Sequence, residues 1–137
     1  MDVVLAPDIY VNASVALGTA PEHAARRAFA GPAKPQTSGW VLERVESMLQ
    51  AIPEFKTAAV DHQMSTIRGL VDVVEQGDHF IEDWEPALVA LAKKAGVTRV
   101  LTDHPDLLGS SESHGIEFVS SDSWLHEQTT PPPPPVV

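Results

Sequence analysis

The chain has 137 residues, of which 43% are hydrophobic and 20% charged, which suits one globular domain with a hydrophobic core better than two. Asp and Glu number 19 against 9 Lys and Arg, and the net charge of -10 argues against a protein that binds nucleic acid over its whole surface. The chain has no cysteine. This excludes disulfides, thiolate nucleophiles and thiolate metal sites, and leaves carboxylates, histidines and hydroxyls for any chemistry.

The first half of the chain predicts one buried strand followed by helices. The apolar run at residues 3–5, which includes two β-branched valines, is typical of a strand that is buried on both faces. Apolar spacing and helix terminators then predict helices over residues 9–17, 21–30, 38–53 and 57–76, with a loop at residues 31–37. Ser38 is the expected cap of the third helix, and Gly77 the expected stop of the fourth.

The second half predicts strands that alternate with helices. We expect a short strand at Phe80 and Ile81, then a helix with Pro86 in its first turn that ends at Gly96. A strand over residues 97–102, a loop over 103–115, a strand over 116–119 and a helix over 122–127 follow, with a cap for the last helix at residues 120–122. We expect a single domain over residues 1–128 and a disordered proline-rich tail over 129–137.

Alternating strands and helices indicate the α/β class, with a mostly parallel sheet covered by helices. Asp8 follows the first strand and Asp103 follows the strand over 97–102. Because ligands bind beyond the carboxyl ends of such strands, we expect these acids to converge at one edge. Paired carboxylates favour Mg²⁺ or Mn²⁺ between them. The alternative is that both residues are ordinary helix caps or turn residues.

A family resemblance rests chiefly on residues 85–108. Glu85 begins a helix with an alanine-glycine stop, and the next strand leads into Thr102-Asp103-His104-Pro105-Asp106-Leu107-Leu108. Residues 115–119, Val11-Asn12-Ala13 and the helix led by Pro21 add to the pattern. Over residues 2–127 this order of elements resembles the PIN domain family, of the VapC-like or a related ribonuclease type. The resemblance implies a three-layer α/β/α sandwich with an acidic pocket for Mg²⁺ or Mn²⁺.

The resemblance also implies which acids form that pocket. Carried over by position, they are Asp8, Glu43, Glu85 and Asp103, with Asp106 as a further metal ligand. Glu46, one turn after Glu43, is the alternative on the same helix.

The chain departs from the family pattern in both acidic motifs. Ala6 stands where the family's first Asp is expected, and Asp8 lies two residues later. His104 stands at the family's later Asp position, between Asp103 and Asp106. A histidine there can orient a phosphate or accept a proton, although a surface histidine more often does neither.

The resemblance implies a metal-dependent endoribonuclease that cleaves single-stranded RNA, acting as the toxin of a toxin-antitoxin pair. An antitoxin protein and a second copy of the chain are the expected protein partners. The alternative is a catalytically degenerate PIN-like domain that serves as a binding or scaffolding module, which Ala6, His104 and the net charge favour.

Several side chains keep two interpretations. Three tryptophans either stack a base or a partner side chain or form helix-helix contacts: Trp40, Trp84 and Trp124. Three basic residues either line one edge of an RNA-binding site or are scattered surface charges: Arg26, Arg27 and Lys34. We favour scattered surface charges. The sequence shows no apolar run long enough for a membrane span and no export leader, so we expect a cytoplasmic protein with no membrane partner.

Overall fold

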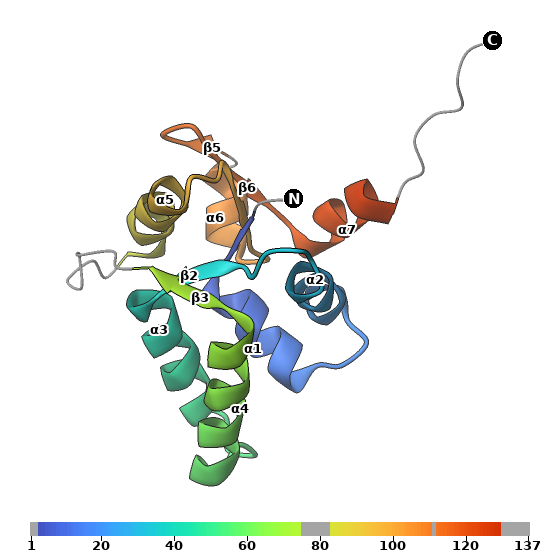
Figure 1. The fold of residues 1–137 in the computed structure, drawn as a ribbon, viewed down its shortest axis with the longest axis vertical. Coiled ribbons are helices and arrows are strands. Elements are labelled where there is room, and N and C mark those ends of the chain that lie inside the picture. Colours follow the sequence, from blue (N-terminus) through green and yellow to red (C-terminus); the bar gives the residue numbers. More distant parts are fainter. Residues whose placement is uncertain (1–2, 75–82, 111, 130–137) are drawn as a thin grey trace.

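The computed structural model describes residues 3–74, 83–110 and 112–129. In these residues short strands alternate with helices, and α5 lies on one side of the strands in Figure 1, with α2 and α7 on the other. The elements are, in chain order, β1 (Val4–Leu5), α1 (Pro7–Val15), α2 (Ala20–Phe29), β2 (Gln36–Ser38), α3 (Gly39–Gln50), α4 (Thr57–Leu70), β3 (Asp72–Val74), α5 (Trp84–Ala95), β4 (Arg99–Leu101), α6 (Pro105–Ser110), β5 (Glu112–Ser113), β6 (Ile116–Val119) and α7 (Ser121–Thr129).

The main sheet has the strand order β1-β4-β6-β5. Val4 pairs with Val100 and Val100 with Phe118, and these three strands run parallel, whereas β5 is antiparallel to β6. Strands β2 and β3 form a separate parallel pair. The arrangement confirms the predicted α/β class with a mostly parallel sheet. It also places the carboxyl ends of β1, β4 and β6 at one edge, where α1, the turn into α6, and α7 begin.

The core lies between the main sheet and its helices. Val4, Leu5, Val100 and Leu101 are each 0% exposed, as expected for strands covered on both faces. Helix α5 packs on β1, β4 and β6, while α1 contacts α2 and α3. Trp124 of α7 is also buried, so the last helix belongs to the same core.

Two predicted helix ends are confirmed in detail. The side-chain oxygen of Ser38 accepts a hydrogen bond from the backbone N–H of Val41 at 3.3 Å, which caps α3. Gly96 ends α5 with φ +74°, a left-handed conformation that costs glycine no Cβ clash.

Two predictions around β2 and β3 are wrong. The predicted loop at residues 31–37 contains the first part of β2, and the helix predicted over residues 57–76 ends at Leu70, before β3. The cause is a pairing between distant segments, since Thr37 lies opposite Val73. The β-branched residues of β3 suit a strand better than a last helical turn, and the pairing with β2 stabilises them there.

The predicted loop at residues 103–115 is also wrong, because it contains α6 and β5. Helix α6 is short, and its first turn is closed by hydrogen bonds from the N–H groups of Leu107 and Leu108 to the carbonyl of His104, each at 3.1 Å. The predicted strand at Phe80 and Ile81, the stop at Gly77 and the proline run fall outside the described residues. The single-domain boundary at residue 128 stays a prediction.

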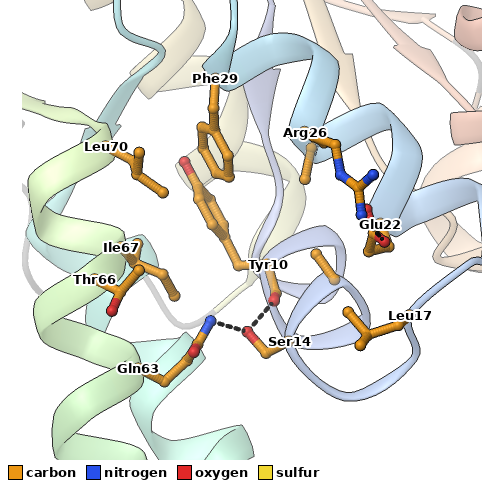
Figure 2. Close-up of a pocket in the computed structure, with 12 residues that line it drawn as sticks. Tyr10, Ser14, Leu17, Glu22, Arg26, Phe29, Gln63, Thr66, Ile67 and Leu70 are labelled. Carbon is orange, nitrogen blue, oxygen red and sulfur yellow. Dashed lines mark hydrogen bonds and ion pairs between the residues drawn. The ribbon is translucent and has the colours of Figure 1, made fainter.

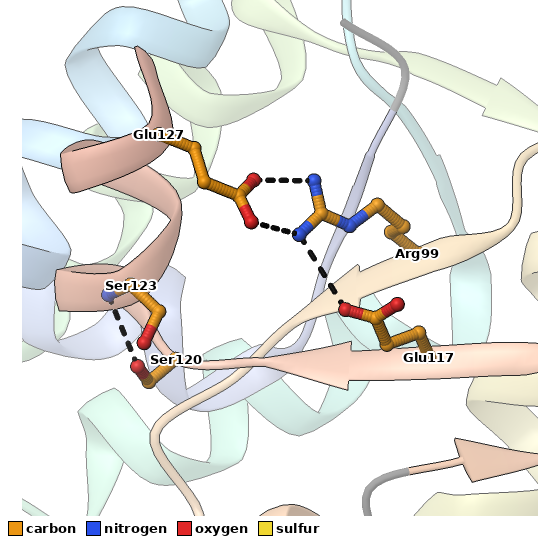
Figure 3. Close-up of polar contacts among 5 residues, drawn as sticks. All are labelled: Arg99, Glu117, Ser120, Ser123 and Glu127. Atoms are coloured by element: carbon orange, nitrogen blue, oxygen red, sulfur yellow. Dashed lines mark hydrogen bonds and ion pairs between the residues drawn. The ribbon is translucent and has the colours of Figure 1, made fainter. Parts of the chain in front are cut away.

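Helix α7 is held to the sheet by the polar contacts in Figure 3. The guanidinium of Arg99 donates to both carboxylate oxygens of Glu127, at 2.7 and 2.9 Å, and to Glu117 at 3.5 Å. The hydrogen bond from Arg99 lowers the pKa of Glu127. Ser120 accepts from the N–H of Ser123 at 3.2 Å, which confirms the predicted cap of this helix. In the described residues no helix is long and apolar enough to cross a membrane.

Candidate acidic site at the carboxyl edge of the sheet

Asp8 lies in the first turn of α1 and joins the ends of two strands. Its Oδ1 accepts a hydrogen bond from the hydroxyl of Thr102 at 2.9 Å, and its Oδ2 accepts one from the backbone N–H of Asp103 at 2.8 Å. The Thr102 hydroxyl in turn accepts from the N–H of His104 at 3.1 Å. The expected convergence of Asp8 and Asp103 at one edge is therefore confirmed, and the Asp8 carboxylate fixes the turn that follows β4.

The environment of Asp8 disfavours its ionised form. Asp8 is only 8% exposed, and burial raises its pKa above the ordinary value, assisted by the negative charge of Asp103 and opposed by the hydrogen bonds from Asp103 and Thr102. The folded chain then holds the Asp8 proton more tightly than the unfolded chain does. The contribution of Asp8 to stability therefore falls as pH rises from the pKa of Asp8 in the unfolded chain to its higher pKa in the folded chain.

We expect Asp8→Asn to remove this pH dependence. As pH rises above the ordinary pKa of an Asp carboxyl, the free energy of unfolding of the variant should rise relative to that of the wild type, because the amide has no proton to lose. Urea denaturation at a series of pH values measures the difference. Asp61→Asn, on the exposed surface of α4, controls for the loss of one charge. Parallel stability curves for Asp8→Asn and the wild type would contradict the expectation.

The carboxylate of Asp103 is turned toward α7. Its Oδ1 accepts from the backbone N–H of Ser121 at 2.8 Å and its Oδ2 accepts from the Ser121 hydroxyl at 2.6 Å. A carboxylate at this place satisfies a free N–H at the helix start and complements the helix dipole. The geometry is that of the helix-cap alternative that the sequence left open for Asp103.

A cleft of about 300 Å³ lies beside this turn, and it contains two of the predicted acids. It is lined by Asp83, Trp84, Glu85, His104, Asp106 and Leu107. Glu85 is half-buried in the first turn of α5, and Asp106 is exposed in the first turn of α6. The ring Nδ1 of His104 accepts from the N–H of Asp106 at 3.3 Å. Sequence reasoning did not assign Asp83 or Trp84 to this wall, although both adjoin Glu85 at the start of its helix.

The two candidate acids on α3 do not line this cleft. Glu43 is exposed, and Glu46 is half-buried and accepts a hydrogen bond from the Gln50 amide at 3.5 Å. Over the parts of the chain that the structure describes, no three His, Asp or Glu side chains come close enough together to hold a metal ion. The predicted acids thus fall into three places: Asp8 and Asp103 in the hydrogen-bonded turn, Glu85 and Asp106 in the cleft, and Glu43 on the exposed surface of α3.

Comparison with known proteins finds similar folds among solved structures of VapC systems. No family model matches the sequence, and no curated protein matches it significantly. A chain of VapBC2 from Rickettsia felis, solved bound to a DNA fragment from its promoter, matches with a TM-score of 0.64 at 9% identity, covering 88% of this chain and 98% of that one. VapC20 from Mycobacterium tuberculosis, described as a toxin that cleaves the sarcin-ricin loop, matches with a TM-score of 0.57 at 18% identity, covering 82% and 97%. The chain therefore has a fold like that of these VapC proteins, a PIN-like fold.

The composition of the cleft suits an open metal site rather than a closed one. Mg²⁺ is often bound through one or two carboxylates, with water and substrate phosphates as the other ligands. Glu85 and Asp106 supply two carboxylates at the wall of one cleft. The hard oxygen donors fit Mg²⁺ or Mn²⁺ in such a shared site.

A second cavity, of about 390 Å³, lies between α1, α2 and α4 (Figure 2). It has an apolar lining that includes Tyr10 and Phe29, whose ring centroids are 6.2 Å apart. At its edge the Gln63 amide donates to the Ser14 hydroxyl at 2.9 Å. The acids predicted for the metal site do not line this cavity.

The basic residues considered for RNA lie away from the acidic cleft. Arg26 pairs with Glu22 at 2.6 Å beside the apolar cavity, and Arg27 donates to the carbonyl of Gln128 at 3.5 Å. Lys34 lines a different cavity, together with Pro35 and Val97. Their placement agrees with the favoured interpretation of scattered surface charges.

Proposed function

We propose that this chain is a ribonuclease that cleaves single-stranded RNA in the acidic cleft with Mg²⁺ or Mn²⁺. The observation that carries the proposal is the position of Glu85 and Asp106, which line one cleft at the carboxyl edge of a PIN-like parallel sheet. This edge is where α/β folds place their ligands.

The proposed roles follow from what each side chain contacts. Glu85 and Asp106 would hold the metal, which when bound supplies a polarised phosphate and an activated water. The imidazole of His104 lies in the same wall and would orient the phosphate. Asp8 acts through the hydrogen bonds that hold the turn carrying His104.

The proposed ligand set also keeps three acids as weaker candidates than Glu85 and Asp106: Asp8, Glu43 and Asp103. The carboxylates of Asp8 and Asp103 each accept two hydrogen bonds from the chain. Ionised carboxylates have further lone pairs, so these contacts weaken a metal role without preventing it.

A second candidate function is a binding module without hydrolysis. Two features favour it: Ala6 lacks the acid expected at the end of β1, and the Asp103 carboxylate caps α7. In this case the cleft would bind RNA or a protein partner without cutting a phosphodiester bond.

Incubation of the purified protein with single-stranded RNA separates the two candidates. We expect cleavage that requires Mn²⁺ and stops with EDTA, and we expect Mn²⁺ without RNA to raise the melting temperature. Metal at 100 times its Kd would stabilise the folded chain by about 2.7 kcal/mol. A protein that neither cleaves RNA nor gains stability with Mn²⁺ would support the binding module instead.

We further propose that the chain acts as the toxin of a toxin-antitoxin pair, with an antitoxin and a second copy as partners. Support comes from the similar solved structures, one a VapBC2 complex and the other described as a toxin. A small open reading frame for a DNA-binding protein beside the gene, whose product co-purifies with this chain, is the expected finding. Size measurement of the purified chain tests the second copy.

A further inference from the structure

A row of aromatic rings leads from α3 into the acidic cleft. The ring of Trp84 meets Trp40 edge to face, with centroids 6.3 Å apart and planes at 86°, and meets His104 at 5.2 Å and 56°. Trp84 and His104 both line the cleft that contains Glu85 and Asp106. The indole of Trp84 is therefore beside the proposed cleavage site.

The far end of the row holds Trp84 in place. Trp40 is 2% exposed, and the guanidinium carbon of Arg44 lies 4.8 Å from its ring centroid, within the range of a cation-π contact. Trp40 is thus buried and serves as a helix contact, which favours the second of its two interpretations over base stacking. Trp84 is half-buried and keeps part of its surface for the cleft, with its orientation set by Trp40 and His104.

We propose that Trp84 stacks on an unpaired nucleobase of the RNA next to the phosphate that the cleft receives. The inference rests on the proposed function for its substrate class. Every base has a π-face, so an indole fixed in advance binds single strands with little sequence selection and little loss of side-chain freedom. A base within a duplex is already stacked and does not reach the indole, which gives the cleft a preference for single strands.

The stacking also offsets the repulsion between an acidic cleft and RNA. Asp83, Glu85 and Asp106 line the wall, and they repel phosphates until a cation is bound. Attraction to the uncharged base is independent of that repulsion. Removal of a base-stacking aromatic weakens binding by about 5-fold to 150-fold.

Two strands of equal length and charge test the inference. A labelled single-stranded oligonucleotide of about eight nucleotides and its abasic counterpart are titrated with the protein and followed by fluorescence anisotropy. Ca²⁺ replaces Mn²⁺ so that the strands stay intact, which a gel checks. We expect the wild type to bind the base-bearing strand more tightly, by about 5-fold to 150-fold. Trp84→Leu should lose this difference and keep its affinity for the abasic strand, whereas Trp84→Phe should keep part of it.

Trp124→Phe is the matched control, because Trp124 is buried in α7 and does not line the cleft; it should bind like the wild type. Equal binding of both strands by the wild type would overturn the stacking and leave the proposed function standing. An equal loss of affinity for both strands in a folded Trp84→Leu protein would assign Trp84 a structural role and would also overturn the stacking. Binding of neither strand by the wild type would overturn the proposed function together with the stacking.

Discussion

Glu85→Gln is expected to reduce Mn²⁺-dependent RNA cleavage by about 100-fold or more, with little loss of stability. The amide keeps the shape of the side chain and removes the negative charge that would bind the metal. Loss of a single group that stabilises charge at a reaction centre commonly costs about 100-fold to 1,000-fold in rate. Glu85 is half-buried in the first turn of α5, where a carboxylate contributes only about 0.3–1 kcal/mol through the helix dipole. Single-turnover cleavage and urea denaturation measure the two effects.

Asp106→Asn should behave like Glu85→Gln, because both carboxylates line the same cleft. Asp83→Asn is the matched control: this residue lines the cleft but lies outside the acids that the family resemblance assigns. We expect it to keep most of the activity. Glu85→Gln and Asp106→Asn should also lose the rise in melting temperature that Mn²⁺ produces. Full activity in both of these variants would move the proposed site to Asp8, Glu43 and Asp103.

Asp103→Ala is expected to act mainly on stability, lowering the free energy of unfolding by about 2–3 kcal/mol. It removes two short hydrogen bonds to Ser121, one to the backbone N–H and one to the hydroxyl. Loss of a helix cap costs about 0.5–2 kcal/mol, and hydrogen bonds to a charged group contribute more than neutral ones. Asp103→Asn keeps one acceptor oxygen and should lose about half as much. Urea denaturation followed by circular dichroism gives these values.

Ser121→Ala provides the control for Asp103. It removes the hydroxyl and leaves the backbone N–H, so the double variant with Asp103→Ala should destabilise less than the sum of the two single changes. A folded Asp103→Asn protein with normal stability but no Mn²⁺-dependent cleavage would contradict the capping role and favour a metal ligand.

Local sequence patterns predicted the elements whose signals lie within one segment. The apolar runs of β1 and β4 predicted buried strands, and Ser38 and Gly96 marked the ends of their helices because each acts on its own neighbours. The pair β2 and β3 was missed because its stabilising contact joins residues 36–38 to residues 72–74. No local window contains that contact.

The candidate site shows the same division. The rule that ligands gather at the carboxyl ends of parallel strands placed Asp8 beside Asp103, and the structure brings them together. Where each carboxylate points depends on a third segment. Asp103 turns to Ser121 because α7 begins beside it after β6. Trp84 lines the cleft next to Glu85, and its ring packs against Trp40 of α3, a contact that spacing along the chain does not reveal.

The hydrogen bonds that run from Asp8 through Thr102 and Asp103 to Ser121 have a consequence for synthesis. A chain emerges from the ribosome N-terminal end first, so Ser121 becomes available only after nearly all of the other described residues have been made. Until then the turn that bears His104 and Asp106 lacks its anchor in α7. The cleft would thus be assembled last, and an interrupted translation product would be released without an ordered acidic wall.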